Sequence, residues 1–383
     1  MSLGFHVRRP LVCVLALGIG AAGFVLPVMS LPVFDRVPVA PTEQTIPLGE
    51  INDQGLIQSA VSMAAWTGAA TVEPLGLGHS HSTHAVLDAP HENLSPAFAT
   101  TTLDTDPFGL VAVTADSPLD LRTRVLVRVR EDGMWSSWEQ LDASEDRPDP
   151  NSLEAANARY GTEPLITGTA DGVQMRMDTP NGVKPANARL VLLDNPVTNE
   201  DANLRGASEP IATAEASTTS APMPSIVTRA QWGADESLRR GSTTYAPTIK
   251  AGFLHHTVTT NNYTPEEAAQ QVRNLYAYFT KSLRYSDMAY NFIVDRFGRL
   301  YEGRAGGMDQ AVVGGHTAGF NQDTFAVSAL GNFQSASPAP EQLNTINDAV
   351  AQLFAWKLSL NHRDPNGTTP LVSDSSAGTS KYR

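Results

Sequence analysis

The sequence predicts two folded domains of different class. A small all-β, sandwich-like domain occupies residues 105–194, and an α/β domain with a mixed β-sheet flanked by helices occupies 225–383. Apolar and polar residues alternate in the first region, which is the period of a strand buried on one face. In the second region short apolar runs alternate with two long helical patterns, which is typical of an α/β domain. A chain of 383 residues has room for both domains.

The N-terminus carries an export pattern over residues 1–30. The basic pair Arg8-Arg9 precedes an apolar run over 11–26, which ends at Pro27. A basic flank before a short apolar core is typical of a secretory signal peptide, so we expect a secreted or cell-envelope protein. The run falls just short of the ~18 apolar residues that favour a spanning helix, which leaves an uncleaved membrane anchor as the alternative.

Residues 31–104 show no sustained hydrophobic period and are predicted to be irregular, apart from a short amphipathic helix near 57–66. The tract His79-Ser-His81-Ser-Thr-His84, with His91 after it, has the composition of a weak metal-binding loop. No carboxylate-bearing scaffold surrounds these histidines, so a solvent-exposed loop is the favoured interpretation.

The predicted β-domain depends on two alternating patterns and a turn. Apolar residues alternate with arginines over 121–130, and a second alternation follows within 173–193. Asp132-Gly133 has the chemistry of a hairpin turn. Trp135 and Trp138 follow this turn and have the rings to stack on sugars, but packing of one in the core and the other over an edge is favoured. After this domain, residues 195–224 are rich in Ala, Ser, Thr, Glu and Pro and are predicted to be a flexible linker.

The α/β domain contains a clear helix start at Thr264-Pro-Glu-Glu267. Threonine caps, proline suits the first helical position, and the second glutamate completes a capping box. An apolar face continues from there to Phe279 at helical spacing. Further along we expect strands at 290–294, 300–302 and 325–330, a hairpin turn at Gly298, and a final helix over 341–360.

The run Ala251-Gly-Phe-Leu-His-His-Thr257 predicts a buried strand that ends in two histidines. Strand side chains alternate, so His255 and His256 point to opposite faces. Neutral imidazole is the commonest metal ligand. In isolation, however, the pair favours a core histidine beside an exposed one.

Several segments between 225 and 383 form an ordered set of motifs. The segments are Ile226–Trp232, the run that ends in His255 and His256, Ala289–Asp295, Leu300–Arg304, Gly314–Asn321 and Leu330–Asn332. In this order and spacing they resemble the peptidoglycan recognition protein and type 2 amidase family, which includes zinc N-acetylmuramoyl-L-alanine amidases. The resemblance implies a mixed sheet flanked by helices. It also implies zinc-dependent hydrolysis of the amide bond between N-acetylmuramic acid and L-alanine in peptidoglycan, in cell-wall turnover.

The resemblance assigns roles to individual residues. His255 matches a zinc ligand, and Tyr290 matches a catalytic tyrosine, whose phenol can donate a hydrogen bond to a developing oxyanion. His316 and Asn321 lie on the glycine-flanked loop that borders the peptide-binding groove in the family, and are candidate substrate-binding residues. A loop-stabilising hydrogen bond is the alternative for His316. His256 is also a candidate substrate contact, although a structural role is favoured.

The chain departs from the family at its zinc site. A catalytic zinc needs three protein ligands, and the family takes two of them from a C-terminal Gly-His-Arg-Asp segment and a following Cys-Pro-Gly. Cys13 is the sole cysteine of this chain, and the similar Asn361-His362-Arg363-Asp364 directly follows the last helix. His362 is therefore predicted to be a helix-end histidine. We expect a C-terminally truncated domain with one incomplete zinc site, and a non-hydrolytic peptidoglycan-binding module is the alternative function.

Charge and context constrain the partners. The net charge of −13 argues against a nucleic-acid-binding protein, which would favour a basic surface. The expected partner is a peptidoglycan muropeptide, and attachment to the cell wall through the β-domain is a further possibility. A weaker third idea is a cell-envelope structural protein. Glu302 and Arg304 are predicted to form a structural ion pair.

Overall fold

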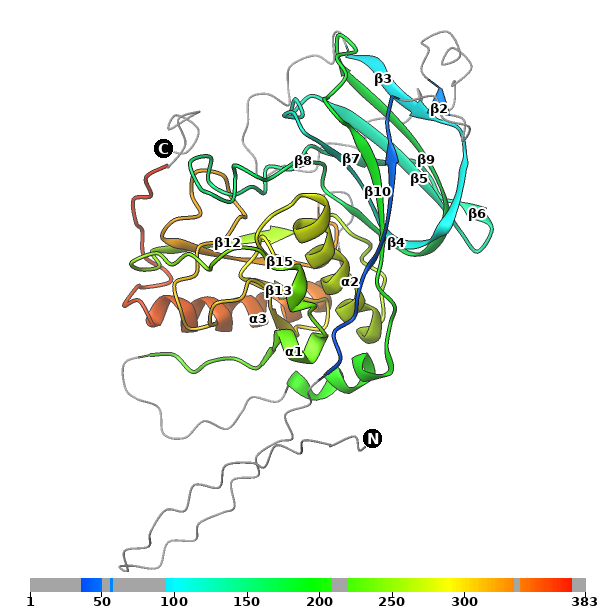
Figure 1. Cartoon of the computed structure of the whole chain (residues 1–383). Helices are drawn as coiled ribbons and strands as arrows, with labels where there is room; N and C mark the ends of the chain where they lie inside the picture. The colour runs from blue at the N-terminus through cyan, green and yellow to red at the C-terminus, as the bar shows by residue number, and fades with distance from the viewer. Residues whose placement is uncertain (1–35, 50–55, 58–93, 209–219, 334–337, 374–383) are drawn as a thin grey trace, which may run out of the picture. The chain divides into compact units, whose positions relative to one another are not determined.

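The computed structural model describes residues 36–49, 56–57, 94–208, 220–333 and 338–373 (Figure 1). The predicted signal segment 1–30, the histidine tract with His91 and most of the expected helix at 57–66 lie outside the described residues. Within the described ranges, no helix has both the length and the apolar character needed to cross a bilayer.

The β-domain is an antiparallel sheet with ten described strands, in the order β1-β10-β4-β9-β3-β2. Strand β5 pairs with β9 and carries β6 and β7, and β8 pairs with β4. Alternate residues of β5 and β9, such as Val127 and Met175, are fully buried in the core. The strands are β1 Thr42–Pro47, β2 Leu56–Ile57, β3 Leu94–Thr100, β4 Leu103–Ala115, β5 Arg124–Glu131, β6 Met134–Trp135, β7 Glu139–Leu141, β8 Tyr160–Gly161, β9 Leu165–Pro180 and β10 Arg189–Asp194.

The hairpin from β5 to β6 shows how local chemistry sets this sheet. Asp132 and Gly133 have φ angles of 50° and 75°, as a two-residue type I′ turn requires. The strand expected from Leu121 begins only at Arg124, the first residue of β5. Leu121 lies before it and is 44% exposed. The prediction that one of Trp135 and Trp138 packs in the core is wrong, because both are only partly buried. The guanidinium carbon of Arg128 lies 5.0 Å from the ring centroid of Trp135 and 5.1 Å from that of Trp138.

The prediction that residues 31–104 are irregular is wrong for β1 and β3. Strand β1 pairs with β10 along its whole length, and β3 pairs with β9. The sequence of β3 does not show the alternation that predicts a strand, because burial along it changes from partial to complete. Its pairing register also shifts between Pro96 and Phe98. An edge strand with mixed polarity likewise lacks a clean period of two.

The flexible-linker prediction for 195–224 is also wrong for its first part. Residues Asn199–Ser208 form a 3-10 helical segment, η3. Within it Asp201 is fully buried and forms ion pairs with Arg36 and Arg273, each at 2.8 Å. One polar residue of η3, Asp201, thus belongs to a buried charge cluster, whereas Asn199, Glu200 and Asn203 are exposed. Composition alone cannot distinguish such a segment from a solvated linker.

The second domain is built on a mixed five-stranded sheet in the order β11-β14-β13-β15-β12, as predicted. Among the described strands of this sheet, β13 and β14 alone pair antiparallel, through a hairpin with Gly298 at φ 78°. Ile293 packs on the face covered by α2, whereas Phe292 and Val294 pack toward α3 on the other face (Figure 1). The elements are β11 Ile226–Val227, α1 Arg229–Trp232, η4 Glu236–Leu238, β12 Ala251–His256, α2 Pro265–Ala277, the π-helical η5 Tyr278–Ser282, β13 Phe292–Val294, β14 Leu300–Glu302, β15 Thr324–Ala329 and α3 Pro340–Ser359.

Two local predictions for this domain have different outcomes. The capping box of α2 forms as predicted, since the Thr264 hydroxyl accepts from the Glu267 amide and the Glu267 carboxylate accepts from the Thr264 amide. The expected full burial of β12 is wrong, because Leu254 is 52% exposed. Among the described strands, β12 pairs only with β15 and forms an edge of the sheet. His362 follows α3 as an exposed residue, as predicted.

Candidate functional site

Three residues from separate motifs meet at the end of β12. The imidazole of His255 lies 5.6 Å from the ring of Tyr290 and 5.7 Å from that of His316, measured between ring centroids. His255 is the penultimate residue of β12, Tyr290 lies two residues before β13, and His316 lies in the loop before β15. The fold thus brings together the predicted metal ligand, the predicted catalytic tyrosine and one predicted substrate contact.

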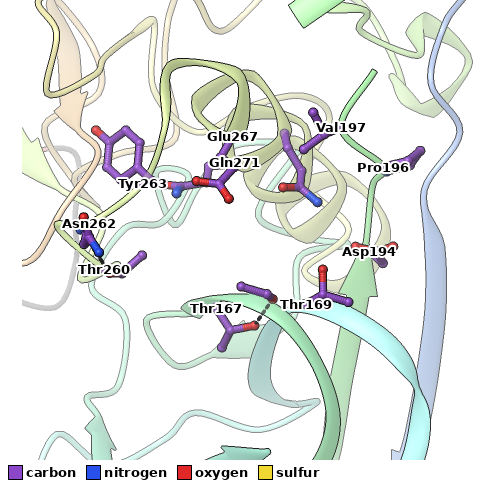
Figure 2. Close-up of a pocket in the computed structure, with 12 residues that line it drawn as sticks. Thr167, Thr169, Asp194, Pro196, Val197, Thr260, Asn262, Tyr263, Glu267 and Gln271 are labelled. Atoms are coloured by element: carbon purple, nitrogen blue, oxygen red, sulfur yellow. Dashed lines mark hydrogen bonds between the residues drawn. The ribbon is translucent and has the colours of Figure 1, made fainter. Parts of the chain in front are cut away.

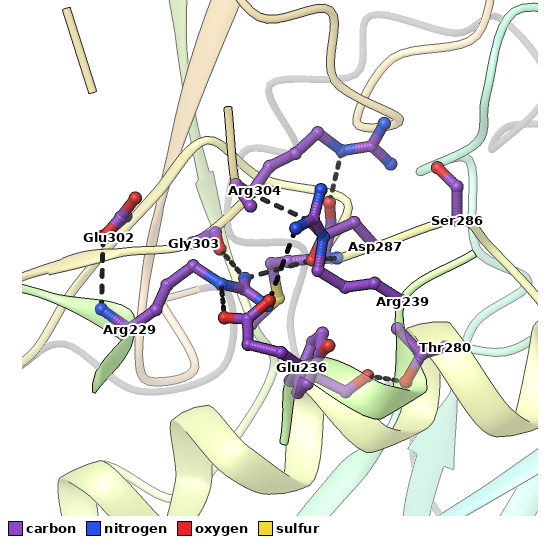
Figure 3. A network of polar contacts seen from close by, with 12 residues as sticks. Arg229, Glu236, Arg239, Thr280, Ser286, Asp287, Glu302, Gly303 and Arg304 are labelled. Atoms are coloured by element: carbon purple, nitrogen blue, oxygen red, sulfur yellow. Dashed lines mark hydrogen bonds and ion pairs between the residues drawn. The ribbon is translucent and has the colours of Figure 1, made fainter. Parts of the chain in front are cut away.

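A buried polar network holds the segment that leads to Tyr290 (Figure 3). Asp287 accepts from the amide of Met288 at 2.7 Å and pairs with Arg229 and Arg239, each at 3.0 Å. Arg229 also pairs with Glu236 at 2.6 Å. These contacts fix α1 and the 286–290 segment together, so the backbone that presents Tyr290 is firmly placed.

The prediction that Glu302 pairs with Arg304 is wrong. Glu302 accepts from the backbone amide of Arg229 at 3.1 Å. Arg304 pairs instead with Glu154 of the β-domain at 2.7 Å, and donates to the carbonyl of Met288. The prediction assumed that both residues lie on one strand, where residues two apart share a face, but β14 ends at Glu302 and Arg304 lies beyond it.

The sequence-based prediction missed Asp146, which lies between β7 and β8. Its carboxylate accepts a hydrogen bond from the Tyr290 hydroxyl, and its other oxygen lies 3.3 Å from Nδ1 of His255. Burial raises the pKa of Asp146 to about 7, although the Tyr290 hydrogen bond opposes this change. Burial lowers the pKa of His255 to about 4. His255 is therefore neutral at pH 7, so its 3.3 Å contact with Asp146 is not an ion pair between opposite charges.

The loop with His316 and Asn321 is held by internal hydrogen bonds. The Asn321 amide oxygen accepts from the backbone of His316 at 2.7 Å and of Thr317 at 3.0 Å. The Thr317 hydroxyl lies 3.1 Å from Nδ1 of His316 and 3.3 Å from Nε2 of His255. His316 is fully buried, and burial together with the nearby His255 and Arg304 lowers its pKa well below the usual value. The substrate-binding roles of His316 and Asn321 stay predictions.

His256 lies on the other face of β12, as strand alternation requires. Its Nδ1 accepts from the backbone amide of Phe333 at 3.3 Å, and its ring meets the Phe333 ring edge-on with centroids 6.0 Å apart. These are structural contacts on the opposite side from Tyr290. A substrate-binding role for His256 stays a prediction.

Residues 142–159, which we call the strap, connect β7 to β8. Three carboxylate side chains of the strap contact the α/β domain. Besides Asp146, Asp149 accepts from the amide of Gly319 at 2.8 Å and from the Asn321 side chain at 2.7 Å. Glu154 accepts from the Ser286 amide at 2.9 Å and pairs with Arg304. The acidic and proline residues of the strap are typical of a turn. Nothing in the local sequence indicates that Asp146 contacts Tyr290, which lies 144 residues further along the chain.

The residues of this site do not fit a complete zinc centre. A catalytic zinc takes three protein ligands. In the part of the chain that the structure describes, no group of three His, Cys, Asp or Glu side chains is placed to hold a metal ion. Among the described residues, His255 and Asp146 are two metal-binding side chains in direct contact at this position.

A separate cavity of ≈ 330 Å³ lies beside α2 (Figure 2). Its wall is mostly polar and comes from both domains, with Thr167 and Asp194 on one side and Tyr263 and Gln271 on the other. None of the predicted site residues lines it. The cavity is therefore distinct from the His255 site.

Comparisons with known proteins divide the chain in the same two parts. Residues 70–224 match the family model described as Rv3811 N-terminal galactose-binding domain-like, and residues 245–375 match the one described as N-acetylmuramoyl-L-alanine amidase. The first match begins well before the predicted start of the β-domain at 105, which agrees with the place of β3 in its sheet.

Individual relatives match the second part. The peptidoglycan recognition protein of Trichoplusia ni is 31% identical over 138 residues, which cover 35% of this chain and 71% of that protein. The N-acetylmuramoyl-L-alanine amidase of Mus musculus is 32% identical over 136 residues, 33% of this chain and 23% of that protein. Among solved structures, Drosophila Peptidoglycan Recognition Protein (PGRP)-SA is 31% identical with a TM-score of 0.29, over 34% of this chain and 71% of that one. Because the motifs, the mixed sheet, the family model and the Trichoplusia ni relative agree, the chain belongs to the peptidoglycan recognition protein and type 2 amidase family.

Proposed function

We propose that the α/β domain hydrolyses the amide bond between N-acetylmuramic acid and L-alanine in peptidoglycan. The observation that carries this proposal is the convergence of His255, Tyr290 and His316 at the end of β12. The match of residues 245–375 to an N-acetylmuramoyl-L-alanine amidase model supports the same reaction. The substrate is then a muropeptide, and the products are a lactyl carboxylate and a stem peptide with a free amino terminus.

The chemistry of Tyr290 suits the step in which the amide carbonyl gains negative charge. Burial raises the pKa of its phenol well above the usual value, so the hydroxyl keeps its proton. A neutral hydroxyl can donate to the developing oxyanion and stabilise it. His255 is neutral at pH 7, as a side chain that binds a metal ion or accepts a proton must be.

Zinc dependence is part of this proposal. The family resemblance implies one zinc ion, whereas the described residues supply only His255 and Asp146 at this position. We therefore assign roles to the protein side chains only. Metal analysis of the purified protein tests this point, because a zinc amidase carries about one zinc per chain and loses it when His255 is replaced by Ala.

A second candidate function is peptidoglycan binding without hydrolysis. The absence of a three-ligand cluster among the described residues favours it. A protein of this kind retains muropeptides and leaves their amide bonds intact.

Product analysis distinguishes the two functions. The purified protein is incubated with soluble muropeptides, and the mixture is examined by mass spectrometry, alongside retention of the protein on insoluble peptidoglycan. Hydrolysis yields separate sugar and peptide products, whose summed mass exceeds the mass of the intact muropeptide by one water. Retention without products supports the binding function, and neither products nor retention contradicts both.

We also propose that the protein is exported and acts in the cell envelope. The basic and apolar pattern of residues 1–30 and the expected cell-wall substrate support this location. Attachment to the wall through the galactose-binding-like domain belongs to the same proposal. Its test is retention of Trp135→Ala and Trp138→Ala variants on peptidoglycan, which should fall if these rings contact sugars.

A further inference from the structure

The strap covers the functional groups that the proposed reaction needs. Asp146 accepts the hydrogen bond of the Tyr290 hydroxyl, which is the group that would donate to the substrate carbonyl. The same carboxylate faces Nδ1 of His255. Tyr290 is 1% exposed and His316 is 0% exposed. In this arrangement a muropeptide carbonyl cannot reach the Tyr290 hydroxyl.

The other two strap carboxylates hold the rim of the same site. Asp149 binds the loop of His316 through the Gly319 amide and the Asn321 side chain. Glu154 binds Arg304 and the Ser286 amide, on the segment that leads to Tyr290. Three separate carboxylates therefore dock one β-domain segment onto two loops of the α/β domain and onto Tyr290 between them.

The strap has few of the features that hold a segment rigidly in place. It contains isolated turns but no helix or strand, and Leu153 near its middle is 91% exposed. Of the strap residues, all of which the structure describes, none belongs to a buried apolar cluster, and only Ala143 and Ala158 near its ends pack against one. The contacts that attach the strap to the site are mainly hydrogen bonds and ion pairs.

We propose that the strap is an autoinhibitory segment, which occupies the muropeptide site of the α/β domain and must leave before substrate binds. This inference rests on the proposed function, because it takes the His255 and Tyr290 site as the place where muropeptide binds. The closed state lowers the apparent affinity for substrate in proportion to the fraction of molecules that are open.

A reversible cross-link tests the proposal on the full chain. A Cβ at position 315 would lie 3.5 Å from Cγ of Pro148, so Pro148→Cys with Gly315→Cys can join the strap to the site loop. Cys13 is the natural cysteine and is removed as Cys13→Ser. We expect the oxidised protein to bind a soluble muropeptide at least about tenfold more weakly than the same protein after reduction. Equal affinity of the two forms would overturn the proposal.

A release variant supplies a readout that does not depend on substrate. Asp149→Ala removes the hydrogen bonds to Gly319 and Asn321. If the strap detaches as a unit, hydrogen exchange of the Ser286 amide, which bonds to Glu154 at the other end, becomes faster. The control is Asp120→Ala, which removes an exposed β-domain carboxylate that pairs with Arg122. Unchanged exchange at Ser286 counts against a detachable strap.

The two experiments separate failure of this inference from failure of the proposed function. If exchange at Ser286 rises but neither the oxidised nor the reduced protein binds muropeptide, the strap is detachable and the proposed function is wrong. If the oxidised and reduced proteins both bind and hydrolyse muropeptide equally, the proposed function stands and the strap is not inhibitory. Should Asp149→Ala fail to fold, the cross-linked pair still decides the question.

Discussion

At the scale of single residues, the site depends on how burial changes side-chain chemistry. His255 is neutral at pH 7 because burial lowers its pKa to about 4, and Tyr290 keeps its proton because burial raises its pKa. Asp146 lies between them with a raised pKa of about 7. Burial on this scale is typical of functional sites. Sequence could nominate His255 and Tyr290, but it could not show that a carboxyl group from another domain faces both.

Glu163 makes a pH-dependent contribution to stability near this site. Burial, followed by the charge of Asp146, raises its pKa from 4.5 to about 8. The folded protein therefore binds the proton more tightly than the unfolded chain. The stability from this group is fully present below about pH 4.5 and is lost as the pH rises to about 8.

Replacing Glu163 by Gln tests this linkage, since glutamine does not titrate. We expect the free energy of unfolding of Glu163→Gln, relative to the unchanged protein, to increase between about pH 5 and about pH 8. Urea unfolding at several pH values measures it. Two stability curves that remain parallel over this range would show that Glu163 has an ordinary pKa in the folded protein.

At the scale of secondary-structure elements, the sequence signals were strongest where a local rule decides the structure. The α2 capping box and the hairpin at Gly298 were predicted because each depends on residues within one turn. Strand β1 and the η3 segment were missed because each is stabilised by distant partners, β10 in one case and Arg273 in the other. Neither partner leaves a mark in the local sequence.

The cap of α2 gives a measurable prediction for an element. Thr264→Ala removes the hydroxyl that accepts from the Glu267 amide, so we expect a loss of about 1 kcal/mol in the free energy of unfolding. Thermal unfolding measures the change. Thr345→Ala, at an exposed threonine within α3, is the matched control and should change stability by less than about 0.5 kcal/mol. Equal effects of both substitutions would mean that the cap is not a stabilising feature.

At the scale of the whole molecule, the described parts of the two domains share a core. Leu110 and Val191 of the β-domain belong to the same buried cluster as Val272 and Tyr276 of α2. The cluster around Asp201 adds a second connection, because it joins Arg36, before β1, to Arg273 on α2. Sequence indicated two independent domains. The sequence could not predict the shared core, because burial within each separate domain would explain the apolar residues of that domain equally well.

Asp201→Asn tests the strength of this connection. The substitution leaves two buried guanidinium groups without their carboxylate, so we expect a loss of about 3–5 kcal/mol in the free energy of unfolding. Asp171→Asn is the control, because Asp171 pairs with Arg130 at a side chain that is 52% exposed. A loss below about 1 kcal/mol for Asp201→Asn would show that the cluster does not hold the domains together.

The central claim is that the site of His255 and Tyr290 cleaves the amide bond of a muropeptide, and one rate measurement tests it most directly. New amino groups of L-alanine are counted over time with the unchanged protein, with Tyr290→Phe, and with Tyr301→Phe as a control that loses another buried hydroxyl. We predict that Tyr290→Phe lowers the rate about 10²-fold while muropeptide binding is kept and Tyr301→Phe retains the rate. Unchanged release by Tyr290→Phe, or no release by any of the proteins, would contradict the claim.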